Sequence, residues 1–242
     1  MGRREVFAVV CLAVLAAGAL SVGTSRGAVR AEGAVIEIRP IGGTLVLIDA
    51  GPSGAPGGLL PGDLVGFVED VAVRGIGLGD IVSFDFIHRD IPAPLDIAAA
   101  LDLVSTGTVI STPQSGNIVV SPTHSVLILG AITLDGKVTL KGGTLIALGG
   151  ATIDGKIEGS GGSKIIIANS VKVDGKIETV GGGLVVIKSS SVDGKISSTG
   201  SSYVQITGNT IRGKLEVISP VGECHVLGNT VDGKTAVAPT CH

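Results

Sequence analysis

The sequence is nearly free of aromatic residues: its 242 residues include no tryptophan, one tyrosine and four phenylalanines. Sites that bind sugars usually use aromatic side chains as platforms, so this scarcity disfavours a sugar-binding groove. Beyond residue 31, no stretch is long and apolar enough to span a bilayer, and the second half shows no helical period of apolar residues. What remains prominent is glycine, with 39 copies, and repeated aliphatic residues.

The first 31 residues have the pattern of a secretory signal. Arg3 and Arg4 precede an apolar run of about 15 residues, and small residues follow it up to Ala31. The run is short for a bilayer span, so we predict cleavage after Ala31, with a retained N-terminal anchor as the alternative. The mature chain is predicted to be secreted to the extracellular space or cell surface, without a membrane span.

The cysteine pattern agrees with export. Cys11 leaves with the predicted signal, and the mature chain keeps Cys224 and Cys241. An even pair in an exported chain favours a disulfide, with two buried free thiols as the alternative. In the chain-entropy treatment, closing a loop of this size contributes about 3 kcal/mol to stability.

A three-residue motif recurs through the second half of the sequence. It is Asp-Gly-Lys five times and Arg-Gly-Lys once, at steps of 19, 20, 19, 19 and 20 residues. The copies stand at 135–137, 154–156, 174–176, 193–195, 212–214 and 232–234. A catalytic motif is normally needed once, whereas a fixed period of about 20 residues indicates stacked structural repeats.

The positions around the motif are aliphatic in almost every copy. In the first copy these positions are Leu127, Leu129, Leu134 and Val138. Their spacing within each segment follows the two-residue period of a strand, and glycine-rich or polar breaks separate the segments. We therefore predict a parallel β-helix over 106–242, with 19–20 residues per coil and six to seven coils. The motif glycines would mark corners where no side chain fits.

Two segments resemble a known group of proteins. "ITGNTIRGKLEV" (206–217) and "VLGNTVDGK" (226–234) are similar to the Gly-Asn-Thr-Val-x-Gly coils of secreted right-handed parallel β-helix repeat proteins of the actinobacterial type. The resemblance covers roughly 106–242. It implies a right-handed solenoid with an exported structural or surface role and no established reaction. Asn209 and Asn229 would then form a partial asparagine ladder.

The repeated charges are predicted to neutralise one another. The lysine of each motif lies two residues after the aspartate, so stacked copies would place the two columns side by side. Exposed pairs of this kind contribute a few tenths of a kcal/mol each. A calcium ladder on the aspartates is the alternative, and the neighbouring lysine column disfavours it.

One outer face of the solenoid is predicted to be apolar. Positions seven and nine before the motif alternate with the predicted core positions, and we expect them to point outward. The apolar residues assigned to this face are Ile128, Ile167, Val186, Leu145, Ile165 and Leu184. A large apolar patch is unusual on a monomer. We expect the chain's own N-terminal region or another protein subunit to cover it.

Residues 32–105 form a region of different composition. They contain runs typical of strands, such as "AVIEI", "GTLVLIDAG" and "GDIVSFDFI", and residues 32–102 hold 11 acidic and 3 basic residues. We predict a small acidic β-rich region, with a short helix over 94–104 that caps the open end of the solenoid. Residues 103–242 hold 9 acidic and 11 basic residues, too weak a positive charge for a nucleic-acid partner.

Candidate catalytic residues all have a structural explanation. Asp154, Asp174 and Asp193 offer the carboxylate pair that glycoside hydrolysis needs, but they are repeat residues beside lysines. His225 and His242 are too few to hold a metal ion. We therefore assign no catalytic residue, no metal site and no cofactor.

The sequence predicts an exported, non-enzymatic β-helix that acts as a structural or adhesive surface element, contacting another macromolecule or itself. The alternative is a carbohydrate-binding or carbohydrate-active protein, with cell-wall or extracellular polysaccharide as its partner. Coils of uniform length without insertions disfavour it. Ice or crystal binding ranks last because Lys172 and Ser191 interrupt the column Thr133, Thr152, Thr210 and Thr230.

Overall fold

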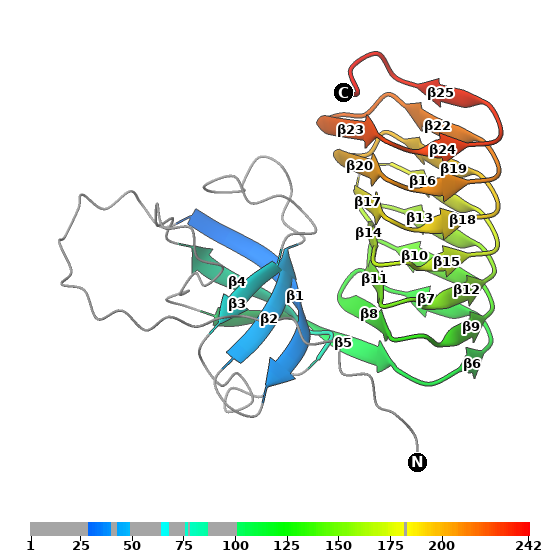
Figure 1. Cartoon of the computed structure of the whole chain (residues 1–242). Coiled ribbons are helices and arrows are strands. Elements are labelled where there is room, and N and C mark those ends of the chain that lie inside the picture. Colours follow the sequence, from blue (N-terminus) through cyan, green and yellow to red (C-terminus); the bar gives the residue numbers. More distant parts are fainter. Residues whose placement is uncertain are drawn as a thin grey trace, which may run out of the picture.

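The fold is known from a computed structural model (Figure 1). It describes residues 29–39, 43–48, 64–67, 76, 78–86, 101–181 and 183–242. Throughout these residues the regular elements are β-strands, which confirms the all-β prediction. Residues 1–28 of the predicted signal lie outside the described residues, and residues 29–31 begin the first strand.

Three parallel sheets wind into a solenoid of about seven turns. Sheet 1 contains β5 (Leu101–Ile110), β8 (His124–Leu129), β11 (Thr144–Leu148), β14 (Lys164–Ile167), β17 (Leu184–Lys188), β20 (Tyr203–Thr207) and β23 (Glu223–Leu227). Sheet 2 contains β6 (Gln114–Ser115), β9 (Thr133–Asp135), β12 (Thr152–Asp154), β15 (Lys172–Val173), β18 (Ser191–Val192), β21 (Thr210–Ile211) and β24 (Thr230–Val231). Sheet 3 contains β7 (Ile118–Val120), β10 (Val138–Lys141), β13 (Ile157–Ser160), β16 (Ile177–Val180), β19 (Ile196–Thr199), β22 (Leu215–Ile218) and β25 (Thr235–Val237).

Each strand pairs with its equivalent one turn away, as the repeat predicts. Leu134 pairs with Ile153 in sheet 2, and Val138 pairs with Ile157 in sheet 3. These four side chains are fully buried in one core that runs along the solenoid axis. The aliphatic positions next to the motif are thus conserved in kind from turn to turn because they stack on each other.

The motif glycines allow the corners of successive turns to touch. A Cβ atom added to Gly155 would lie 2.2 Å from the carbonyl oxygen of Gly136, and one added to Gly175 would lie 2.3 Å from that of Gly155. No side chain fits at such a distance, since the obstacle is backbone. This close approach explains why glycine recurs at this place in every turn.

Sheet 1 continues beyond the solenoid into an antiparallel sheet. The added strands are β4 (Ile81–Phe86), β1 (Val29–Arg39), β2 (Gly43–Ile48) and β3 (Leu64–Phe67), in that order. The strand β5 joins the two parts: its residues 101–105 pair antiparallel with β4, and its residues 106–110 pair parallel with β8. Figure 1 shows β5 running from one part into the other.

The helix predicted over 94–104 is wrong for its last four residues. Residues 101–104 belong to β5, because their backbone completes the ladder with β4. Residues 94–100 lie outside the described residues.

In the first turns, the side chains of sheet 1 that were predicted to face outward face inward, and those predicted to face inward face outward. Ile128, Leu145, Ile165 and Ile167, expected on the outer face, lie in the core inside the solenoid. From β17 onward the alternation reverses, and Leu184 and Val186 point outward, as expected. In the earlier turns the outer positions are occupied by Leu127, Leu129, Ile146, Leu148, Ile166 and Ala168.

The exchange comes from the corner between sheet 1 and sheet 2. After β11 the corner has two left-handed residues, Gly149 (φ 74°) and Gly150 (φ 80°), whereas after β17 it has one, Ser189 (φ 47°). Because side chains alternate along a strand, one residue more or less in the corner turns the whole strand over relative to the motif. The strand pairing shows this change in corner length. Ile165 pairs with Val185, 20 residues later, whereas the motif of the same two turns recurs after 19 residues.

Candidate functional site

The outer face of sheet 1 carries a buried apolar cluster. It consists of Ile81, Leu127, Ile146, Leu148, Ile166, Leu184, Val186 and Tyr203. These side chains are at most 6% exposed although all except Ile81 lie on the outside of the solenoid. Ile81 comes from β4 of the N-terminal part. The face is therefore covered within a single chain.

Short contacts fix the N-terminal part against the first solenoid turn. The backbone N–H of Gly107 donates to Asp80 Oδ1 at 2.7 Å, and the Ser125 hydroxyl donates to the Gly79 carbonyl oxygen. A Cβ atom on Gly107 would lie 2.1 Å from the carbonyl carbon and oxygen of Gly79. Asp80 is buried, so its carboxylate acts as a cap on the edge of β5. The sequence shows no signal for this cap beyond a Gly-Asp pair before a strand.

The motif lysines pair with glutamates of sheet 3. Glu158 accepts from two of them: Lys137 Nζ and Lys156 Nζ each lie 2.5 Å from one of its carboxylate oxygens. Glu178 is bound in the same way, 2.5 Å from Lys176 Nζ and 2.6 Å from Lys195 Nζ. We call this row, continued by Lys214 and Glu216, the Lys–Glu ladder.

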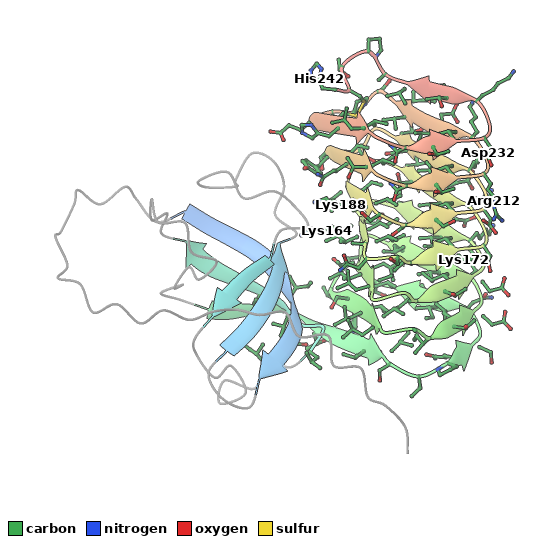
Figure 2. The ribbon with its side chains drawn as sticks, viewed as in Figure 1. Lys164, Lys172, Lys188, Arg212, Asp232 and His242 are labelled. Carbon is green, nitrogen blue, oxygen red and sulfur yellow. A yellow bond between two sulfur atoms is a disulfide. The ribbon has the colours of Figure 1, made fainter. Side chains whose placement is uncertain are left out.

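The ladder differs from the predicted pairing of lysine with aspartate. The aspartates end or directly follow the strands of sheet 2, whereas the lysines come after the glycine corner, directly before the strands of sheet 3. Two aspartates find other partners: Asp174 lies 2.5 Å from Lys172 Nζ, and Asp193 lies 3.2 Å from Arg212 Nη1. Figure 2 shows Lys172, Arg212 and Asp232 on one side of the solenoid.

The ladder holds its carboxylates in the ionised form. Hydrogen bonds from Lys137 and Lys156 lower the pKa of Glu158 to about 2. Hydrogen bonds from Lys176 and Lys195 lower the pKa of Glu178, and one from Lys214 lowers that of Glu216. A general acid needs a pKa raised toward the working pH. The ladder carboxylates have the opposite shift, which suits a structural role.

The asparagines near the C-terminal end form the expected partial ladder. Asn209 Nδ2 donates to the Ile187 carbonyl oxygen at 2.8 Å and to Asn229 Oδ1 at 2.9 Å. Asn209 Oδ1 accepts from the Ser190 N–H at 3.0 Å. The side chain is buried, so it satisfies corner backbone groups that water does not reach.

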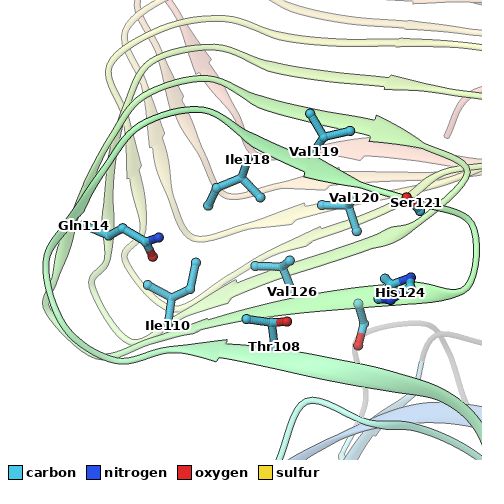
Figure 3. A pocket seen from close by; sticks show the side chains of 10 residues that line it. Thr108, Ile110, Gln114, Ile118, Val119, Val120, Ser121, His124 and Val126 are labelled. Atoms are coloured by element: carbon cyan, nitrogen blue, oxygen red, sulfur yellow. The ribbon is translucent and has the colours of Figure 1, made fainter.

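The first turn encloses a hollow that the sequence did not indicate. It has a volume of about 310 Å³ and is bordered by β5, β6, β7 and β8. In Figure 3, Ile110, Ile118 and Val126 point into the ring of this turn, while Val119 points away. The hollow is lined by Thr108, Ile110, Gln114, Ile118, Val119, Val120, Ser121, His124, Ser125 and Val126. The weak signal for this turn is Ser115-Gly116-Asn117, 20 residues before the first Asp-Gly-Lys.

The last turn carries a disulfide between Cys224 and Cys241, with their Cα atoms 4.5 Å apart. His225 Nε2 lies 3.6 Å from a carboxylate oxygen of Glu223, and His242 lies at the end of the solenoid (Figure 2). In the part of the chain that the structure describes, no group of three or more His, Cys, Asp or Glu side chains is placed to hold a metal ion.

The described residues contain no helix long and apolar enough to cross a membrane. Comparison of the chain with protein families, curated proteins and solved structures gave no match. The function must therefore be inferred from the fold and its surfaces.

Proposed function

We propose that this protein is an exported, non-enzymatic structural element that contacts another macromolecule, or copies of itself, through the surfaces of a rigid β-solenoid. One observation carries the proposal. From β8 to β25 the strands of all three sheets keep their register from turn to turn, without an inserted loop among the described residues. A groove for a chain-like substrate would need irregular loops on one side of the coils.

The Lys–Glu ladder supports a structural role. Each of Glu158 and Glu178 binds lysines of two successive turns, so the ladder ties neighbouring turns together on the surface of sheet 3. The pairs neutralise a surface that would otherwise repel itself. Such a surface remains soluble without becoming a strong electrostatic site for charged small molecules.

Export is supported by two independent features. The N-terminal 31 residues have the signal pattern, and the disulfide between Cys224 and Cys241 is of the kind that persists in oxidising compartments. In this setting, we propose that the N-terminal region is the internal partner of the apolar outer face. Cell-wall or extracellular polysaccharide is the proposed external partner of the remaining surfaces.

A carbohydrate-active enzyme is the second candidate, and the motif aspartates are its only specific support. Asp135 and Asp154 pair in register on sheet 2, and Asp174 and Asp193 follow on the next two turns. Ion pairs with Lys172 and Arg212 occupy two of these carboxylates. Ice or crystal binding is weaker still, since Lys172 stands between Thr152 and Ser191 in the same column.

One experiment distinguishes the structural role from carbohydrate-active catalysis. The full chain is incubated with insoluble cell walls and with neutral and acidic polysaccharides, and both co-sedimentation and the release of reducing ends or unsaturated sugars are measured. We expect binding to at least one polymer and no product. Product release would contradict the structural role and support catalysis if the double variant Asp174→Asn, Asp193→Asn abolishes it. Thr133→Ala is the control and should leave that release intact.

A further inference from the structure

Positive charges collect on the outer surface of sheet 3. Its strands, together with the residue directly before each strand, contain seven lysines and three glutamates, an excess of four positive charges. The strands of sheet 2, taken with the residue directly after each strand, contain five aspartates against one lysine and one arginine. The two neighbouring faces therefore carry net charges of opposite sign, although residues 103–242 as a whole are nearly neutral.

The motif lysines stand in one straight row. Val138 N–H donates to the Lys156 carbonyl oxygen of the next turn at 2.9 Å, and Ile157 N–H donates to that of Lys176 at 2.8 Å. Successive lysines are thus one strand spacing apart, about 4.8 Å, and the row is about 24 Å long. We call it the lysine row, and its members are Lys137, Lys156, Lys176, Lys195, Lys214 and Lys234.

The Lys–Glu ladder fixes the lysine row without using all of its hydrogen-bond donors. Glu158 and Glu178 each bind lysines of two successive turns, which holds four ammonium groups in place. Each of these groups contacts one glutamate oxygen, whereas an ammonium group has three N–H donors. The four lysine side chains are still 32–41% exposed. The row therefore presents preorganised donors to a further anion.

The surface beside the lysine row is open. The outward side chains of β10, β13, β16, β19 and β22 are half-buried or exposed, unlike those on the outer face of sheet 1. Val180 and Ile218, at the ends of β16 and β22, are 63% and 43% exposed. A sugar ring with an acidic substituent has an apolar C–H surface as well as a negative charge. The face offers a contact for each.

We propose that the lysine row binds a linear polyuronate, an acidic polysaccharide with one carboxylate on each sugar, laid along the solenoid axis. This rests on the proposed function, because it names the chemistry of the external partner. One sugar of an extended chain is close in length to the distance between successive lysines, so the carboxylates on its protein side recur at whole multiples of that distance. A small anion meets one partly neutralised ammonium group, whereas a polymer meets several at once.

Alginate oligomers of increasing length test the row, with their methyl esters as the uncharged control. Affinity for the full chain is measured by titration calorimetry at low and high salt. Lys156→Gln with Lys195→Gln removes two ammonium groups from the row. Lys172→Gln with Lys188→Gln is the matched control, because it changes the net charge equally but on sheets 2 and 1. Circular dichroism checks that each variant folds, and Lys214→Gln with Lys234→Gln replaces a row variant that does not.

We expect the affinity to rise with oligomer length up to about six sugars, the length of the row, and then to level off. The row variant should weaken binding about tenfold and the control much less, and salt should weaken it further. Methyl esters that bind as well as the acids, or equal weakening by both double variants, would overturn the lysine row. Binding of a neutral wall polymer without binding of alginate would overturn the row and leave the proposed structural role standing, whereas release of sugar products would overturn that role.

Discussion

At the scale of single residues, the glycine corners and the Lys–Glu ladder explain why the motif repeats. The corner glycine and its position were predictable from the sequence, since only a position that excludes side chains keeps glycine in all six copies. The partner of the lysine was not predictable. The spacing places lysine two residues from aspartate and two from glutamate alike, and only the bend at Gly155 or Gly175 decides which carboxylate it meets.

Replacing a corner glycine should destabilise the solenoid. In Gly155→Ala the new methyl group would meet the Gly136 carbonyl oxygen at 2.2 Å, so the backbones of two turns must separate. We expect the free energy of unfolding to fall by about 1–3 kcal/mol, the usual range for overpacking. Gly200→Asn is the control: this position has φ 65° and open space around it, and asparagine tolerates that conformation. An equal loss in both variants, measured by denaturant unfolding, would contradict the backbone clash.

The ladder should make stability depend on pH in the acid range. The pKa of Glu158 is about 2 in the folded chain and about 4.3 for an unperturbed glutamate. A carboxyl group whose pKa is lowered by folding stabilises the fold above its unfolded pKa, and the contribution is lost as pH falls toward the folded pKa. Glu158→Gln should therefore lower the free energy of unfolding at neutral pH by about 1 kcal/mol or less, because the side chain is 31% exposed and screened.

The Glu158→Gln difference should shrink between about pH 5 and pH 2 and vanish below that range. Denaturant unfolding of both proteins at a series of pH values measures it. A difference that stays constant down to pH 2 would show that the lost packing of the side chain, not its charge, is responsible.

At the scale of strands and corners, the length of a corner decides which side chains a strand buries. The strands themselves were predictable, because aliphatic residues repeat with the turn. Which side chains of β8, β11 and β14 face the core was not predictable from a single column, since apolar residues occupy both the inward and the outward positions of these strands. The corner after β14, with Asn169 (φ 62°) and Ser170 (φ 65°), is one residue longer than the corner after β17, and no clear sequence signal marks this difference.

The asparagine corner between β20 and β21 should stabilise the last turns. Asn209→Ala removes the acceptor of the buried Ser190 N–H and the donor to the Ile187 carbonyl oxygen. Leaving buried backbone groups without partners costs about 1–3 kcal/mol each, so we expect a loss of at least that size in the free energy of unfolding. Thr210→Ala, an exposed neighbour, should change it little. Equal losses would mean that the corner depends on backbone shape alone.

At the scale of the whole molecule, the antiparallel N-terminal strands continue sheet 1 of the solenoid. The boundary near residue 105 was visible in the sequence as a change of charge, because lysine occurs only in the repeat. From the sequence, the chain's own N-terminal region or another subunit was expected to cover the apolar outer face. The pairing of β5 with both β4 and β8 brings Ile81 into the buried cluster on this face, and nothing local in the sequence of β5 indicates two partners.

A charge on the outer face should release the N-terminal strands and leave the solenoid intact. Ile166 is fully buried in the cluster that contains Ile81. We expect Ile166→Asp to increase hydrogen exchange in β1 and β4 by at least tenfold, while exchange in sheets 2 and 3 stays slow. The control is Val119→Asp, at a side chain that is 59% exposed. Faster exchange throughout the solenoid would show that Ile166 belongs to its core instead.

The most direct test of a face closed within one chain is the mass of the oxidised full chain in solution. Light scattering after size exclusion, without reductant and over a wide range of concentration, gives that mass. A single monomeric value at every concentration is the predicted result, because the apolar cluster on sheet 1 is already covered. A dimer that persists on dilution, and that Ile166→Asp converts to a monomer, would contradict it and make this face an interface between copies.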